Sequence, residues 1–267
     1  MPRVQICLLG EFETRADDRP IRLRLPRKAF GMLTFLAARP GQAHSRDKLA
    51  RLLWGDGTGA QAHHSLRQAL MSLRRALAGA GLPALIVAEG DTLAFDPTHA
   101  EVDLAEFERR VAQGGWKGLE QSAALYRGDF LEGFSLDEVA FEEWSAGERE
   151  RLRELAVETL ARLVQHYLHR PGAVAAAIHS ALRLLRLDRT QEVVHRTLIR
   201  LYARQGRRAE ALRQYGRCVG ALRDELGIEP EPETMLLHHE ILGRPPAGPP
   251  WPGARPLPRR GPPVTPS

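Results

Sequence analysis

The stretch from Gln61 to Ala78 constrains the fold of this chain more than any other stretch. Leu66, Leu70, Leu73 and Leu77 recur at intervals of four, three and four residues, which is the spacing of one stripe along an α-helix. The other positions carry several basic and amide side chains and no Asp or Glu. Because an ordinary amphipathic helix mixes both charges on its wet face, this pattern favours a polyanionic partner. A solvated surface helix that happens to lack acids is the alternative.

Charge is divided unevenly along the chain of 267 residues. Residues 1–100 hold 14 Lys and Arg against 9 Asp and Glu, whereas residues 101–243 hold 20 against 24. Residues 244–267 hold four Arg and no acid, and they are dense in Pro and Gly. The basic first part and the acidic middle part predict two modules with different partners. The last part is typical of a disordered tail or a linker.

Several classes of protein lack support in this sequence. The N-terminus has no apolar segment of a secretory signal, and no apolar run approaches the roughly 18 to 20 residues that span a bilayer. We therefore expect a soluble, cytoplasmic chain with no membrane partner. Cys7 and Cys218 match no metal or redox spacing, which predicts buried free thiols. Nucleotide-binding and nucleophile-elbow motifs are absent, so we predict no enzyme, no cofactor and no metal site.

The order of elements in the first 100 residues is informative. The predicted elements are strands over 4–14 and 21–25, helices over 27–39, 46–54 and 61–78, and a hairpin over 85–95. Ser45 is a good N-cap for the second helix, and Gly90 marks the hairpin turn. Small strands, three helices and a terminal hairpin are typical of a winged helix, whose third helix enters the major groove of DNA.

The region from 101 to 243 predicts an all-helical fold, with one long helix over about 139–168. Large, large, small and large residues occur at the spacings of a tetratricopeptide repeat, namely Leu198, Tyr202, Ala211 and Tyr215. One repeat earlier stand the apolar residues Val164, Leu168, Ala177 and Ala181. Gly206 falls at the turn between the two predicted helices. Such helix pairs stack on one another and leave a concave face for a protein partner.

Seven stretches carry a resemblance to a known family. In the first part they are LLGEFE (8–13), RKAFGMLTFLA (27–37), SRDKLARLLW (45–54) and LRQALMSLRRAL (66–77). In the second part they are LYRGDFLEGF (125–134), RTLIRLYARQGRRAEALRQY (196–215) and LRDELGIEPEPET (222–234). The first set resembles the DNA-binding domain of the actinobacterial antibiotic-regulatory activators (SARP family). The second set resembles the bacterial transcriptional activator domain.

This resemblance implies a mainly α chain in three parts: a winged-helix DNA-binding domain over 1–100, an all-helical activator domain over 101–243 and the tail over 244–267. It also implies a sequence-specific transcriptional activator that binds direct repeats in promoter DNA and recruits RNA polymerase, with a homo-oligomer on DNA as one arrangement. From the opposite charges and the separate cores that we expect, residues 1–100 should fold and bind DNA alone, though more weakly, and activation should need residues 101–243.

Candidate DNA contacts follow from residue type and position. Arg and Gln can pair bidentately with base edges, and helix starts suit phosphate groups. The base-contact candidates are His64, Arg67, Gln68, Met71 and Arg74. The phosphate-contact candidates are Arg27, Lys28, Ser45, Arg46 and Arg75, with Arg74 and Arg75 dividing between base and phosphate. For each Arg, a solvated cation is the alternative.

Two departures from the family pattern concern the DNA contact. Regulators of this class often carry a second Arg where Ser72 stands, and the wing tip Glu89-Gly90-Asp91 is acidic. Because like charges repel, such a wing is expected to be short or held off the DNA. Two other functions stay open: a helical-repeat adaptor whose winged helix binds protein, and the N-terminal regulatory part of a larger multidomain regulator. Salt-sensitive retention on DNA distinguishes the adaptor from the activator.

Overall fold

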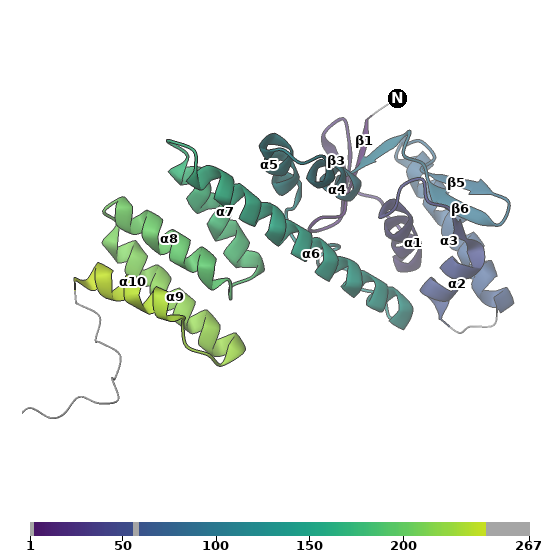
Figure 1. The fold of residues 1–267 in the computed structure, drawn as a ribbon. Helices are drawn as coiled ribbons and strands as arrows, with labels where there is room; N and C mark the ends of the chain where they lie inside the picture. The colour runs from purple at the N-terminus through teal and green to yellow at the C-terminus, as the bar shows by residue number, and fades with distance from the viewer. Residues whose placement is uncertain (1–2, 56–58, 244–267) are drawn as a thin grey trace, which may run out of the picture. The chain divides into compact units, whose positions relative to one another are not determined.

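The computed structural model describes residues 3–55 and 59–243, and the predicted tail over 244–267 lies outside the described residues (Figure 1). The strands are β1 (Val4–Cys7), β2 (Glu13–Ala16), β3 (Arg19–Ile21), β4 (His44–Ser45), β5 (Ile86–Glu89), β6 (Thr92–Phe95) and β7 (Ala100–Val102). The helices are α1 (Arg27–Ala37), α2 (Arg46–Trp54), α3 (Gly59–Gly79), α4 (Asp103–Gln113), α5 (Trp116–Leu125), α6 (Val139–Leu168), α7 (Val174–Leu187), α8 (Glu192–Arg204), α9 (Arg208–Leu226) and α10 (Pro232–Leu242). The predicted fold class is confirmed: a winged helix is followed by a helical region.

The strands form two small sheets, ordered β3-β2-β1-β7 and β4-β6-β5. The expected single strand over 4–14 is wrong, because the chain turns between β1 and β2 where Gly10 has φ +111°. The expected second strand over 21–25 is also wrong beyond Ile21. Leu8 and Gly10 instead bind the segment around Phe130 through backbone hydrogen bonds, so a distant part of the chain replaces the expected local pairing.

Strand β7 has no counterpart among the predicted elements. It pairs in parallel with β1, with Val4 opposite Ala100 and Ile6 opposite Val102. Asp103, the first residue of α4, accepts hydrogen bonds from the backbone N–H groups of Leu8 and Leu9 at 2.7 and 3.2 Å. The predicted boundary at residue 100 therefore falls inside the N-terminal sheet rather than in a linker.

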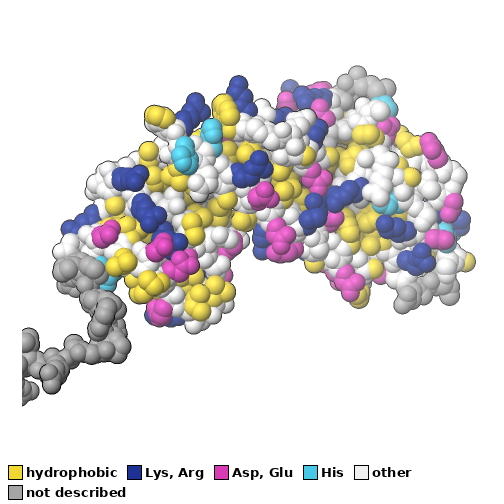
Figure 2. Space-filling model, in the orientation of Figure 1, with side chains coloured by type: hydrophobic (Ala, Val, Ile, Leu, Met, Phe, Trp, Pro, Cys, Tyr) yellow, Lys and Arg dark blue, Asp and Glu magenta, His cyan; other side chains and the backbone are white. Residues whose placement is uncertain are grey.

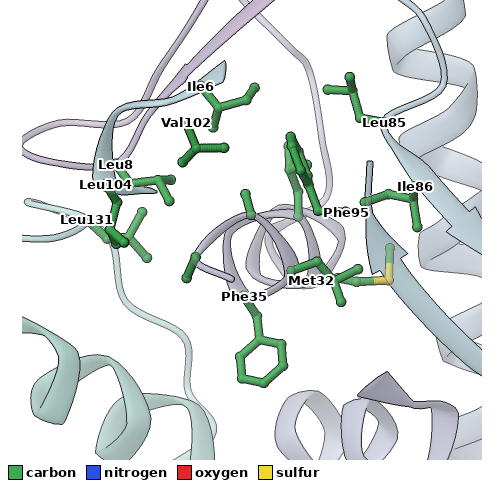
Figure 3. Packing of buried hydrophobic residues seen from close by; sticks show 14 of the residues in the cluster. Ile6, Leu8, Met32, Phe35, Leu85, Ile86, Phe95, Val102, Leu104 and Leu131 are labelled. Carbon is green, nitrogen blue, oxygen red and sulfur yellow. The ribbon is translucent and has the colours of Figure 1, made fainter. Parts of the chain in front are cut away.

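Helix α1 lies at the centre of the hydrophobic core, because its apolar residues are distributed around most of its circumference. Figure 3 shows side chains from β1, β5, β6, β7 and α4 around it. This core continues from Val4 to Ala156 without a break at residue 100. At Gly31 an added Cβ would lie only 2.5 Å from Leu136 Cδ1, so glycine lets the segment before α6 pack directly on α1.

The first half of α6 belongs to the same core. Trp144 packs against Phe35 of α1, with ring centroids 4.8 Å apart, and Phe141 is fully buried beside Trp144. Arg39 pairs with Glu148 at 2.9 Å, and Figure 2 shows acidic and basic side chains together over this part of α6. Arg149 donates hydrogen bonds to carbonyls in residues 126–138, which we call the connector. The predicted bounds of the long helix, 139–168, are confirmed.

The chain divides into two compact units, Met1–Arg189 and Thr190–Ser267. In the first, α7 packs along the second half of α6. In the second, α8 and α9 form the predicted helix pair, and Gly206 has φ +73° at the turn between them. The predicted repeat residues are buried or half-buried except Leu168, which is 38% exposed. Buried Arg196 on α8 binds Glu231 and Thr234, which holds α10 in place.

The structure also bears on the two cysteines and on helices long enough to span a membrane. Cys7 and Cys218 are buried and form no disulfide, as predicted. Among residues 3–55 and 59–243, no helix combines the length and apolar content needed to cross a bilayer.

Candidate nucleic-acid interface

Helix α3 packs against the protein core through the same leucine stripe that predicts the helix from the sequence. Leu66, Leu70, Leu73 and Leu77 are all buried, with at most 5% exposed. Ala62 and Ala69 are also buried and widen this stripe into a face. Burying a Leu side chain contributes about 1.5–3 kcal/mol, so the stripe fixes both the position and the rotation of the helix. The rotation in turn decides which side chains reach solvent.

The exposed face of α3 carries every base-contact candidate. His64, Arg67, Gln68, Met71 and Arg74 are all exposed, and Arg75 lies beside them. Intervals of three and four residues place them along one side of the helix. Met71 is 46% exposed, which makes it an apolar contact available to a partner. Within the described residues, none of these four polar and charged candidates nor Arg75 has a recorded hydrogen bond or ion pair.

Helix α2 begins beside the wing. Ser45 is its N-cap, as predicted, and its hydroxyl accepts a hydrogen bond from the backbone N–H of Lys48 at 3.2 Å. Ser45 also pairs with Thr92 of β6, and the backbone N–H of Arg46 donates to the carbonyl of Asp91 at 2.9 Å. The structure therefore brings Ser45 and Arg46 together with the wing tip.

Arg27 and Lys28 have a different environment from the exposed face of α3. The Arg27 guanidinium donates to the carbonyl of Ser135 and lies 5.7 Å from the ring centroid of Phe134. The Lys28 ammonium pairs with Glu138. Both cations therefore bind the connector before α6, where they hold α1 against it. Their role as phosphate contacts stays a prediction.

Two histidines contact other residues of the helix-turn-helix, His63 at the surface and His44 in the interior. His63 Nε2 lies 2.6 Å from Asp47 Oδ1, which joins the first turn of α2 to α3. His44 is buried with its ring centroid 4.9 Å from that of Phe35. Burial lowers the pKa of His44, and the Lys48 charge adds to this effect, so the neutral imidazole is the packed form. The Asp47–His63 contact spans two helices and leaves no signal in the sequence.

Arg51 is an exposed cation outside the set of predicted DNA contacts. It lies in the last turn of α2, where its charge suits the negative end of the helix dipole, and no ion pair is recorded for it in the described part of the chain. Its charge is its only sequence signal. Because α2 packs on α3, Arg51 joins the candidate phosphate contacts.

The wing is short and acidic at its tip. Strands β5 and β6 have four residues each, and Gly90 has φ +53° between the exposed residues Glu89 and Asp91. If the tip lies near phosphate, replacing both acids with Ala should strengthen DNA binding several-fold by removing repulsion. Replacing both with Arg should strengthen binding further and steepen its dependence on salt. Fluorescence anisotropy against a salt series measures both effects. Unchanged affinity in both variants would show that the wing tip does not approach DNA.

The described residues offer no alternative centre for metal chemistry. Within residues 3–55 and 59–243, no three His, Cys, Asp or Glu side chains are grouped so that they could hold a metal ion. Helix α3 presents guanidinium groups, an amide and a thioether on one exposed face.

Two family models match this chain. Residues 91–242, more than half of the chain, match the family model of the bacterial transcriptional activator domain. Residues 19–89 match the model described as transcriptional regulatory protein, C terminal. These two ranges place α3 in the transcriptional regulatory match and the helices from α4 to α10 in the activator match.

Three regulatory proteins are similar to this chain along most of its length. Transcriptional regulatory protein MoaR1 of Mycobacterium tuberculosis is 24% identical over 251 residues, which cover 90% of this chain and 79% of MoaR1. Transcriptional regulatory protein EmbR of M. tuberculosis is 25% identical, with 91% of this chain and 64% of EmbR covered. Regulatory protein AfsR of Streptomyces coelicolor is 26% identical, with 90% and 24% covered.

A solved structure shares the fold. M. tuberculosis EmbR in complex with a low affinity phosphopeptide aligns with a TM-score of 0.61 at 22% identity. The alignment covers 92% of this chain and 66% of that chain. This chain therefore spans just under two thirds of EmbR and about a quarter of AfsR.

Proposed function

Because this chain belongs to the SARP family of actinobacterial transcriptional regulators, we propose that α3 reads promoter DNA in the major groove while the helices after it activate transcription. The observation that supports this most is the exposed face of α3, where five base-contact candidates lie side by side without an acid. In a helix-turn-helix protein this is the helix that enters the groove. Residues 1–100 then supply DNA recognition, and residues 101–243 supply activation.

The side chains of α3 and of the start of α2 suggest which residues would contact base edges and which would contact phosphate groups. Arg67 and Gln68 lie in its N-terminal half, which usually meets base edges, and can pair with guanine and adenine respectively. Met71 offers an apolar contact to a thymine methyl group, and Arg74 and Arg75 reach outward from the second half. Arg46 and the cap residue Ser45 lie at the start of α2, where phosphate contacts commonly form.

The family resemblance extends the proposal to direct repeats and RNA polymerase. Copies bound to direct repeats face the same way, so any contact between them is head to tail rather than two-fold symmetric. Repeat spacing would then match a whole number of DNA turns, about 10 base pairs each, so that each α3 meets the same face of the duplex.

Genome-wide footprinting of the tagged full chain tests this function. Protected sites should share a short motif repeated in one orientation, and retention on these sites should fall steeply with salt. Purified RNA polymerase should yield more transcript from a template carrying the repeats when the chain is added. A helical-repeat adaptor predicts a different result: no shared motif, and retention that depends neither on salt nor on DNA sequence.

A further inference from the structure

Beside α1 the N-terminal sheet opens into a cleft, which we call the hairpin cleft. It has a volume of about 1070 Å³ and lies between residues 9–14 and 20–24, with Phe30, Arg127 and Glu132 completing its walls. The hairpin of β2 and β3 pairs only as far as Thr14 and Ile21, after which its two arms separate. All of these residues lie in the first compact unit.

The chain leaving β3 runs along this cleft outside any strand. For Leu23 and Arg24, no backbone hydrogen bond to another described residue is recorded, and neither lies in a strand. Their exposure alternates, with Leu23 half-buried and Arg22 and Arg24 exposed. An extended segment with free N–H and C=O groups is a surface to which another extended chain can add.

One residue in the wall of the cleft carries a buried hydroxyl without a hydrogen-bond partner among the described residues. Thr14 is 1% exposed and lines the cleft, and its Oγ1 has no hydrogen-bond partner among the described residues. Burying an unpaired hydroxyl is costly, so its persistence in the wall of a cleft points to a ligand group that completes it. Phe12 and Phe30 pack edge to face with centroids 4.4 Å apart and form an apolar part of an otherwise largely polar wall.

The charged residues of the hairpin cleft favour a polypeptide over a nucleic acid as its partner. Arg22 and Arg24 have no recorded ion pair within the described residues. Glu13 in the lining is paired with Arg15 at 2.8 Å and with Arg127 at 3.5 Å, whereas Glu11 and Glu132 also line the cleft and would repel a continuous phosphate backbone. A polypeptide can instead place carboxylates opposite the two arginines, apolar side chains over the phenylalanines and N–H donors toward the glutamates.

We propose that the hairpin cleft binds an extended segment of a partner protein in which acidic and apolar residues alternate. The arginines hold its carboxylates, the free backbone of residues 23–24 binds its backbone, and Thr14 bonds one of its polar groups. This site is separate from α3, so the chain can hold DNA and this partner through different surfaces of the first unit.

A random octapeptide phage library, selected on the immobilised full chain, tests the proposal. Enriched peptides should alternate acidic and apolar residues. The affinity of these peptides, measured by fluorescence anisotropy, should be at least about tenfold lower for the Arg22→Glu/Arg24→Glu double variant than for the parent chain. In this variant two charge-assisted hydrogen bonds are replaced by repulsion. Arg19→Glu is the matched control, because Arg19 is exposed nearby but does not line the cleft. The affinity of the Arg19→Glu variant for the enriched peptides should stay within about twofold of that of the parent chain.

Thr14→Val separates binding from folding. Valine has nearly the same shape and removes only the unpaired hydroxyl, so thermal stability should be unchanged or higher while peptide affinity falls about fivefold. Three results would overturn the proposal: enrichment that is equal on the parent and the double variant, enrichment of basic peptides, or displacement of the peptides by duplex DNA. The last result would assign the cleft to nucleic acid.

Discussion

A chain truncated after residue 100 is expected not to fold, although its charge makes it look like a separate module. Its core loses Leu104, Phe107, Phe130, Leu136 and Phe141, all of which are at most 3% exposed in the structure. Each such side chain contributes about 1.5–3 kcal/mol, and an entire domain has only about 5–15 kcal/mol of net stability. Strand β7 would also be cut after its first residue.

Two fragments test whether the truncated chain folds. Thermal melts followed by circular dichroism and the chemical-shift dispersion of the amide protons in NMR spectra are the measurements. Residues 1–100 should give no cooperative transition, whereas residues 1–189, which end at the boundary of the first compact unit, should melt cooperatively. The longer fragment should also keep DNA binding. A cooperative transition in the shorter fragment would show that the helices after β7 are dispensable, and it would restore the expectation that residues 1–100 fold alone.

Arg67→Ala is expected to cost about five- to 150-fold in affinity for the DNA site that footprinting defines, because a bidentate base contact is worth about 1–3 kcal/mol. Binding to a scrambled duplex should change much less. Arg67 is exposed and its neighbours Leu66 and Leu70 hold the helix, so the fold should remain intact. Arg75→Ala, as a phosphate contact, should weaken both duplexes alike and lower the salt slope by about one.

Two further variants sharpen this test. Arg67→Lys keeps the charge but loses the planar fork, so it should retain the salt slope and lose most of the discrimination. Arg217→Ala on α9 removes an equally exposed cation far along the chain and serves as the charge control. Salt titrations on both duplexes supply the data, with circular dichroism as the folding check. Equal proportional losses on the two duplexes for Arg67→Ala would reduce α3 to a non-specific basic surface.

Local patterns predicted those parts of the fold that local interactions stabilise. The leucine stripe of α3, the Ser45 cap and the Gly90 turn each act over a few residues, and the structure contains all three. The bounds of α6 were equally accessible, because its apolar spacing continues through both halves. The exposed face of α3 follows from the same stripe, since fixing the buried side fixes the opposite one.

Long-range pairing could not be predicted in this way. Strand β7 forms because β1 provides a parallel partner, and its three residues are too few to carry a strand signal alone. Likewise, the position of Arg27 and Lys28 at a helix start predicts phosphate contacts, and nothing local in the sequence reveals that they bind Ser135 and Glu138 of the connector. The hairpin cleft depends on Phe30 and Glu132 meeting the separated arms of β2 and β3, which no spacing in the sequence reveals.

The 30 residues of α6 also have a mechanical consequence. Its first half is clamped to α1 and α2, and its second half carries α7, so one uninterrupted rod of about 45 Å joins them. Such a rod acts as a lever arm: a tilt of about 5° at the clamped end displaces the other end by about 4 Å. If the winged helix tilts together with this end of α6 when it docks, the start of α7 moves farther than the docked surface does.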